Sequence, residues 1–164
     1  MSLINLGGII SPSFNSTDGM SMDIYLAGCR REPHCEGCHN PELWDFDYGE
    51  QVDGKTFIDI LEKRRVDKVD NITIMGGEPL HQKNLIDILE LIRSNFKGKN
   101  IWLYTSYMFE EIPSSIINKI HYIKTGKFIK TLKIKGWLGS KNQKLWKVCG
   151  TGRELFYEEG YKAI

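Results

Sequence analysis

Residues 71–80 read NITIMGGEPL, and this stretch decides the fold class. The apolar, β-branched residues of 71–75 predict a buried strand, which ends at Gly76 and Gly77. A helix is predicted next, because apolar residues recur along one face at helical spacing. These residues are Leu85, Ile88, Leu89, Ile92 and Phe96. Gly98 is expected to stop this helix. A strand, a glycine turn and a helix in this order are typical of a parallel sheet.

Comparable elements flank this stretch on both sides. Strands are predicted at 22–27, 101–105, 122–123 and 131–134, and a helix at 56–65. A weaker helix is predicted at 109–120, where Pro113 must occupy the first turn or break it. Strands and helices therefore alternate, which predicts an α/β fold with a mostly parallel sheet and outer helices.

Length and composition set further bounds. A chain of 164 residues is expected to form one domain over 1–164. No apolar run approaches the ~20 residues that cross a bilayer, so no membrane partner is expected. The first ten residues, MSLINLGGII, lack the basic and apolar regions of a secretory leader. We therefore expect a cytoplasmic, reducing location, where clustered cysteines favour metal binding over disulfides.

Three of the four cysteines lie in residues 28–44, which read GCRREPHCEGCHNPELW. They are Cys29, Cys35 and Cys38, and they follow the predicted strand 22–27. Sites on parallel sheets form from the loops after the carboxyl ends of the strands. The loops after residues 27, 75 and 105 begin at that edge, so we expect the cysteines to meet the other two loops there.

The three thiols allow four interpretations. A structural zinc site needs a fourth ligand, which His34, His39 or Cys149 could supply. An electron-transfer cluster would usually have four cysteines. A catalytic thiol needs only one cysteine, so the clustering would go unexplained. A [4Fe–4S] cluster on three thiolates would leave one iron open to an exogenous ligand such as S-adenosylmethionine.

The turn after strand 71–75 bears on this choice. Gly76 and Gly77 allow the backbone to approach a ligand closely, and Glu78 can accept a hydrogen bond from an ammonium group. Pro79 fixes the turn. A plain turn into the helix is the alternative interpretation. Together with the three cysteines, the turn favours a ligand-binding loop.

The cysteines and the turn 76–79 together resemble the radical S-adenosylmethionine superfamily. The closer resemblance is to the activating proteins of anaerobic (class III) ribonucleotide reductases. Matching stretches are GCHNPELW (37–44), WLYTSYMFEEI (102–112) and TGKFIKTL…GSKNQKLW (125–146). The resemblance implies a partial, incomplete TIM-like barrel, since roughly 160 residues cannot close an eight-fold barrel of about 250.

The resemblance also implies the site. Cys29, Cys35 and Cys38 would ligate the [4Fe–4S] cluster, and no further catalytic side chain is expected. The S-adenosylmethionine site would comprise Gly76, Gly77, Glu78, Pro79, Tyr104, Thr105, His39 and Asn40. Departures from the family pattern are the wide spacing of Cys29 and Cys35, Ser106 in place of a glycine, and Lys124-Thr125-Gly126 where an acidic residue and a glycine are common.

The implied activity is reductive cleavage of S-adenosylmethionine to a 5′-deoxyadenosyl radical, which generates a glycyl radical on the large reductase subunit. A low-potential flavodoxin or ferredoxin would supply the electron. Nine lysines and no acidic residue lie between Glu111 and Glu154, which is either a solvated face or a docking surface. One alternative is an activase of another glycyl-radical enzyme, or a small-molecule radical enzyme. The other is a zinc module with a basic nucleic-acid-binding face, although nucleic acid is not the expected partner.

Overall fold

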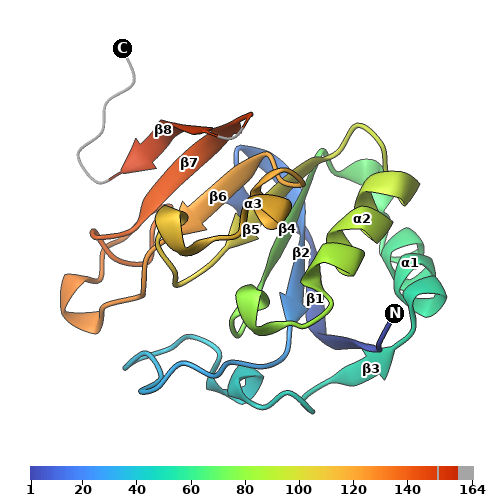
Figure 1. Ribbon diagram of the computed structural model, residues 1–164, viewed down its shortest axis with the longest axis horizontal. Helices are drawn as coiled ribbons and strands as arrows, with labels where there is room; N and C mark the ends of the chain where they lie inside the picture. Colours follow the sequence, from blue (N-terminus) through green and yellow to red (C-terminus); the bar gives the residue numbers. More distant parts are fainter. Residues whose placement is uncertain (151, 159–164) are drawn as a thin grey trace.

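Four parallel strands form the centre of an eight-stranded sheet in the computed structural model, which describes residues 1–150 and 152–158 (Figure 1). The strand order is β3-β1-β2-β4-β5-β6-β7-β8. The strands are β1 (Ile4–Thr17), β2 (Gly19–Leu26), β3 (Glu50–Val52), β4 (Asn71–Gly76), β5 (Asn100–Tyr104), β6 (Tyr122–Thr125), β7 (Lys144–Cys149) and β8 (Gly152–Glu158). Strands β2, β4, β5 and β6 pair in parallel, whereas the strands on both flanks pair antiparallel.

The helices are short and lie between the parallel strands in sequence. The α-helices are α1 (Gly54–Lys63), α2 (Leu85–Asn95) and α3 (Ser114–Ile117). Single 3-10 turns occur at Pro41–Trp44, Val66–Lys68, Pro79–His81, Phe109–Glu111 and Lys130–Leu132. In the residues that the structure describes, no helix is long and apolar enough to span a bilayer.

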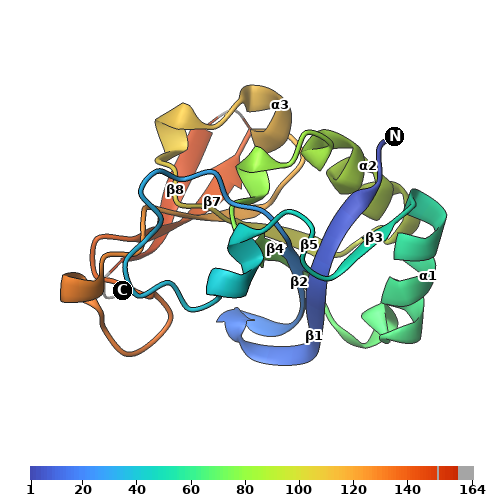
Figure 2. The ribbon, with the colours of Figure 1, turned by 90° about the horizontal axis from the view of Figure 1, so that it is seen from below.

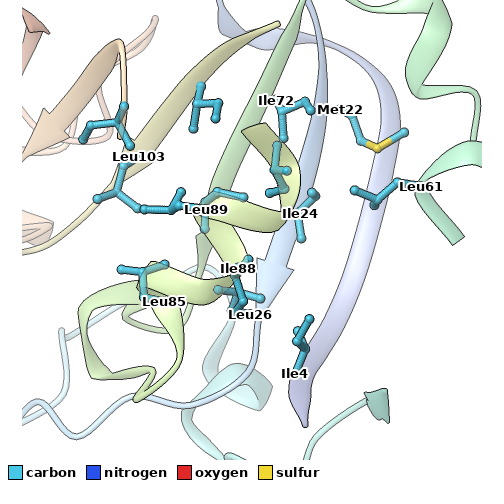
Figure 3. Close-up of a cluster of buried hydrophobic side chains, with 14 of the residues drawn as sticks. Ile4, Met22, Ile24, Leu26, Leu61, Ile72, Leu85, Ile88, Leu89 and Leu103 are labelled. Carbon is cyan, nitrogen blue, oxygen red and sulfur yellow. The ribbon is translucent and has the colours of Figure 1, made fainter. Parts of the chain in front are cut away.

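The core lies between the sheet and α1 and α2 (Figure 3). Alternate residues of each parallel strand point to this side, because successive side chains in a strand face opposite ways. On α2, the predicted apolar face is buried against them, with Leu85, Ile88, Leu89 and Ile92 at most 2% exposed. Asp53 caps α1, where its carboxylate accepts from the Thr56 N–H at 2.7 Å.

The opposite face of the sheet carries aromatic and polar residues. Trp102 is 1% exposed and stacks on Tyr122 with ring centroids 4.1 Å apart. Tyr104 follows two residues later on β5, and Lys124 occupies the matching position on β6. Tyr104 and Lys124 lie at the carboxyl ends of β5 and β6. The carboxyl ends of the parallel strands are at the lower edge of the sheet in Figure 1.

The predicted alternation of strands and helices is confirmed at the centre of the sheet, and the antiparallel flanks were not predicted. The predicted strand at 131–134 is wrong. The chain there forms a 3-10 turn, and Lys133 makes only an isolated bridge to Ser140. Backbone bonds to residues 139–141 hold this segment instead, because the Lys141 N–H donates to Leu132 O at 3.0 Å and the Ile134 N–H donates to Gly139 O at 3.2 Å. The helix predicted at 109–120 is broken at Pro113, as anticipated, into a 3-10 turn and α3.

Candidate functional site

The cysteine loop is fastened by its backbone across the ends of β2 and β4 (Figure 2). The Gly28 N–H donates to Leu43 O at 2.8 Å, and the Cys29 N–H donates to Trp44 O at 3.1 Å. The turn after β4 then joins the loop, because the Glu78 N–H donates to Gly28 O at 2.9 Å. These bonds place the first cysteine beside the glycine turn, although the two are far apart in sequence.

Gly76 and Gly77 are required by this backbone contact. A Cβ on Gly76, whose φ is +134°, would lie 2.1 Å from Leu26 O. A Cβ on Gly77 would lie 2.4 Å from Gly28 O. Only glycine allows such close approach. The sequence suggested a close approach of this turn to a ligand; in the structure, Gly76 closely approaches the end of β2, and Gly77 closely approaches the start of the cysteine loop.

All three clustered cysteines line one cavity of about 440 Å³. Cys29, Cys35 and Cys38 are free thiols and partly exposed, whereas Cys149 is exposed on β7 and is not among the lining residues. Burial raises the pKa of Cys29 and of Cys35. Within 1–150 and 152–158, no three His, Cys, Asp or Glu side chains converge on a single metal ion. A [4Fe–4S] cluster does not require its cysteines to converge on one ion, because each thiolate binds a separate iron.

The cavity also brings together most of the predicted cofactor residues. Gly76, Gly77, Glu78, Tyr104, Thr105, His39 and Asn40 all line it. Pro79 does not line it and is buried at the start of a 3-10 turn. The apolar part of the wall includes Trp44, Met75 and Phe128. Three loops that follow β2, β4 and β5 thus contribute to one site, which agrees with the edge expected from the sequence.

Glu78 joins two of these loops through a buried carboxylate that is 1% exposed. Its Oε1 accepts from the Thr105 hydroxyl at 2.7 Å and from the Leu80 N–H at 3.1 Å. Its Oε2 accepts from the Ser106 hydroxyl at 2.6 Å and from the Ser106 N–H at 2.9 Å. A carboxylate offers about four lone-pair positions, so the protein itself already occupies them.

Arg31 and His81 contribute to the site and were not singled out from the sequence. Arg31 donates to the Ser106 hydroxyl at 2.9 Å and to Ser106 O at 3.0 Å, and its guanidinium lies 3.8 Å from the Tyr107 ring centroid. His81 Nδ1 accepts from the Arg30 N–H at 2.8 Å, so its Nε2 donates to the Tyr107 hydroxyl at 2.7 Å. The only signal for Arg31 was the widened spacing between Cys29 and Cys35.

The two loop histidines differ in their surroundings. His34 Nε2 lies 3.0 Å from Cys29 O, and its ring stacks on Trp44 with centroids 4.1 Å apart. His34 therefore supports the loop from within. His39 is exposed, and its ring lies 4.9 Å from that of Phe128 at the cavity wall.

Residues 16–146 match the model of a family described as "4Fe-4S single cluster domain". The chain belongs to this family. Among curated relatives, the anaerobic ribonucleoside-triphosphate reductase-activating protein of Enterobacteria phage T4 is 30% identical over 148 residues, covering 87% of this chain and 94% of the relative. The proteins of that name from Escherichia coli K12 and Salmonella typhi are 33% and 32% identical over 136 and 137 residues, each covering 76% of this chain and 86% of the relative.

The donor set fits the cluster that gives this family its description. Three thiols share one cavity, and in the described residues no fourth cysteine lines it. Thiolates are the usual ligands of iron–sulfur clusters. Residues 139–143, near the end of the family match, also contribute to this cavity. Gln143 lines the cavity, and its side-chain oxygen accepts from the Gly139 and Ser140 N–H groups, each at 3.0 Å.

Proposed function

We propose that this protein is a radical S-adenosylmethionine enzyme, a single domain over 1–164, that installs a glycyl radical on an anaerobic ribonucleotide reductase. One observation carries the proposal. Three cysteines and the turn with Gly76, Gly77 and Glu78 line the same cavity, in a chain of the 4Fe-4S single cluster domain family. Relatives that cover most of the chain are named as activating proteins of this reductase.

The proposed roles follow from the chemistry of each side chain. Cys29, Cys35 and Cys38 would hold a [4Fe–4S] cluster as thiolates. When bound, the cluster supplies the single electron that splits S-adenosylmethionine into methionine and a 5′-deoxyadenosyl radical. A glycine Cα of the reductase would then give a hydrogen atom to that radical, which leaves 5′-deoxyadenosine and the glycyl radical.

The protein would bind S-adenosylmethionine and exclude water around it. The backbone of Gly76 and Gly77 and the side chains of Tyr104 and Thr105 would form one wall of the cofactor site, with His39 and Asn40 on the cysteine side. Trp44, Met75 and Phe128 supply apolar surface, which favours a dry cavity. With its carboxylate already accepting four hydrogen bonds, Glu78 would act mainly by fixing the loops that touch the cofactor.

The finer fold that we propose is an incomplete TIM-like barrel. Four parallel strands with helices on one face support it, since a full barrel of this kind needs eight parallel strands. The antiparallel flanks would leave the barrel open at the side. This opening would admit the glycine loop of a protein substrate, which a closed barrel would exclude.

Basic side chains beside the cysteine loop would serve a protein partner. Lys127 Nζ lies 3.5 Å from Pro33 O, and Lys130 Nζ lies 3.7 Å from a carboxylate oxygen of Glu36. Lysines close to a redox centre attract acidic carriers. We therefore assign Lys127 and Lys130 to the docking of a low-potential electron donor, such as flavodoxin or ferredoxin, in the cytoplasm.

Electron paramagnetic resonance (EPR) of anaerobically reconstituted, reduced protein tests the proposal. We expect a [4Fe–4S]⁺ signal that changes when S-adenosylmethionine is added, and a glycyl doublet when the reductase subunit is present. A signal indifferent to S-adenosylmethionine would refute the function.

The same samples separate the alternatives. A doublet on another glycyl-radical enzyme, but none on the reductase, would favour a different activase. Product formation on a small molecule alone would favour a small-molecule radical enzyme. Zinc without iron, together with salt-dependent binding to nucleic acid, would favour the zinc module.

A further inference from the structure

Lys124 places a cationic side chain in the cavity from the sheet itself. It lies on β6 between Ile123, which is 0% exposed, and Thr125, which is 2% exposed. Because side chains alternate along a strand, Lys124 points to the face opposite the apolar core. Lys124 lines the same cavity as the three cysteines and Tyr104.

The ammonium group of Lys124 has no anionic partner in the part of the chain that the structure describes. No ion pair and no hydrogen bond of its Nζ occurs among 1–150 and 152–158. The contact found is with the face of the Tyr104 ring, whose centroid lies 4.1 Å away. Burial lowers the pKa of Lys124 to about 8. Burial is the sole cause of this shift, which agrees with the absence of a nearby carboxylate.

The other charged groups on the cavity wall are already engaged. Glu78 is the one Asp or Glu among the lining residues, and its oxygens accept four hydrogen bonds from Leu80, Thr105 and Ser106. Arg31 is held against Ser106 and Tyr107. Lys124 is therefore the cation in this wall that is left for a ligand.

Lys124 is half-buried, and a partly desolvated ammonium without a counter-ion is unfavourable, so that pairing with an anion would stabilise it. S-adenosylmethionine carries one negative charge, the carboxylate of its methionyl part. Its sulfonium and its α-ammonium group are positive, so the carboxylate is the group of the ligand that the lysine attracts. A carboxylate has two oxygens, so one remains free for the lysine when the other is bound elsewhere.

We propose that Lys124 binds the carboxylate of S-adenosylmethionine and thereby orients the methionyl part in the cavity. This inference rests on the proposed function. It makes Lys124 a binding residue of this chain, in addition to the cofactor residues that were expected from the sequence.

Binding of three adenosyl ligands to the cluster-loaded protein tests this inference. S-adenosylmethionine and S-adenosylhomocysteine carry the carboxylate, whereas 5′-methylthioadenosine lacks the whole amino-acid part. We expect Lys124→Met to weaken the first two by about 10- to 100-fold, the range of a lost charge-assisted hydrogen bond, and to leave the third within about 2-fold. Lys124→Arg should recover part of the loss, and Lys147→Met, an exposed lysine on β7, should change nothing.

Equal weakening of all three ligands by Lys124→Met, or no weakening of S-adenosylmethionine, would overturn the inference. The melting temperature of the ligand-free variants checks for a merely structural role. Loss of an unpaired, partly desolvated charge should leave Lys124→Met at least as stable as the wild type, so a lower melting temperature would also count against the inference. Wild-type protein that binds iron but not S-adenosylmethionine would instead refute the proposed function.

Discussion

Substitution of Glu78 by glutamine should destabilise the protein even before any cluster is bound. An amide keeps one acceptor oxygen and replaces the other with an NH₂ group. If the oxygen faces Ser106, the NH₂ group faces the Leu80 N–H; in the other orientation it faces the Ser106 N–H. Hydroxyl groups can turn to accept, but a backbone N–H cannot. One buried N–H therefore loses its acceptor whichever way the amide lies, and the remaining hydrogen bonds lose their charge.

The expected cost is about 2–4 kcal/mol, from one unsatisfied buried donor and the weakening of charge-assisted bonds. For a domain of this size, such a cost lowers the melting temperature by roughly 5–15 °C. The assay is thermal unfolding of cluster-free Glu78→Gln by circular dichroism under reducing conditions. Glu42→Gln is the control, because Glu42 is exposed within the 3-10 turn that follows the cysteine loop.

Ser106→Ala tests whether the two residues act together. Alone it should cost about 1 kcal/mol, since one hydroxyl donor to the carboxylate is lost. Combined with Glu78→Gln it should cost less than the sum of the two, because they share partners. A Glu78→Gln protein that melts within about 1 °C of the wild type would refute the assignment of Glu78 as the residue that fixes the loops.

Three further predictions concern the cysteines, the glycine turn and pH. Cys38→Ser should abolish the roughly four irons per chain of the reconstituted protein, while Cys149→Ser retains them; equal iron content in both would contradict the ligand set. Gly77→Ala should destabilise the cluster-free protein by about 1–3 kcal/mol, measured by urea unfolding, because its Cβ would overlap Gly28 O; an unchanged midpoint would contradict the close backbone contact. Burial lowers the pKa of Lys124 to about 8, from its ordinary value of 10.5. Between these two pH values the unfolded chain binds more protons than the folded protein. The free energy of unfolding of the wild type should therefore rise with pH from about 8 to 10.5. This gain should reach at most about 3 kcal/mol and be absent from Lys124→Met; parallel pH profiles for the two proteins would refute the shift.

The central elements were predictable because their signals are local. Strands 22–27, 71–75 and 101–105 are apolar runs bounded by turn residues, and α2 carries a complete apolar face. The first strand, β1, was missed because its sequence mixes polar residues and a proline with apolar ones, and its register against β2 shifts repeatedly. Pairing with β2 and β3 on its two sides, rather than a local pattern, makes that segment a strand.

The site was predictable in its position more than in its detail. The rule that loops meet at the carboxyl ends of parallel strands brought the cysteines to the glycine turn and to Thr105. The partners of Arg31 and His81 could not be foreseen, because these contacts span 75 and 51 residues of sequence. The hydrogen bonds of Glu78 to Thr105 and Ser106 span 27 and 28 residues, which likewise hid its positioning role.

The backbone bonds of Gly28 and Cys29 have a consequence for how this protein is matured and repaired. They tie the cysteine loop to Leu43 and Trp44 through main-chain groups, with no contribution from a thiol. The polypeptide can therefore take its shape first and receive iron and sulfide afterwards. If exposure to air destroyed the iron–sulfur cluster, the protein would stay folded, and fresh iron and sulfide alone would restore it.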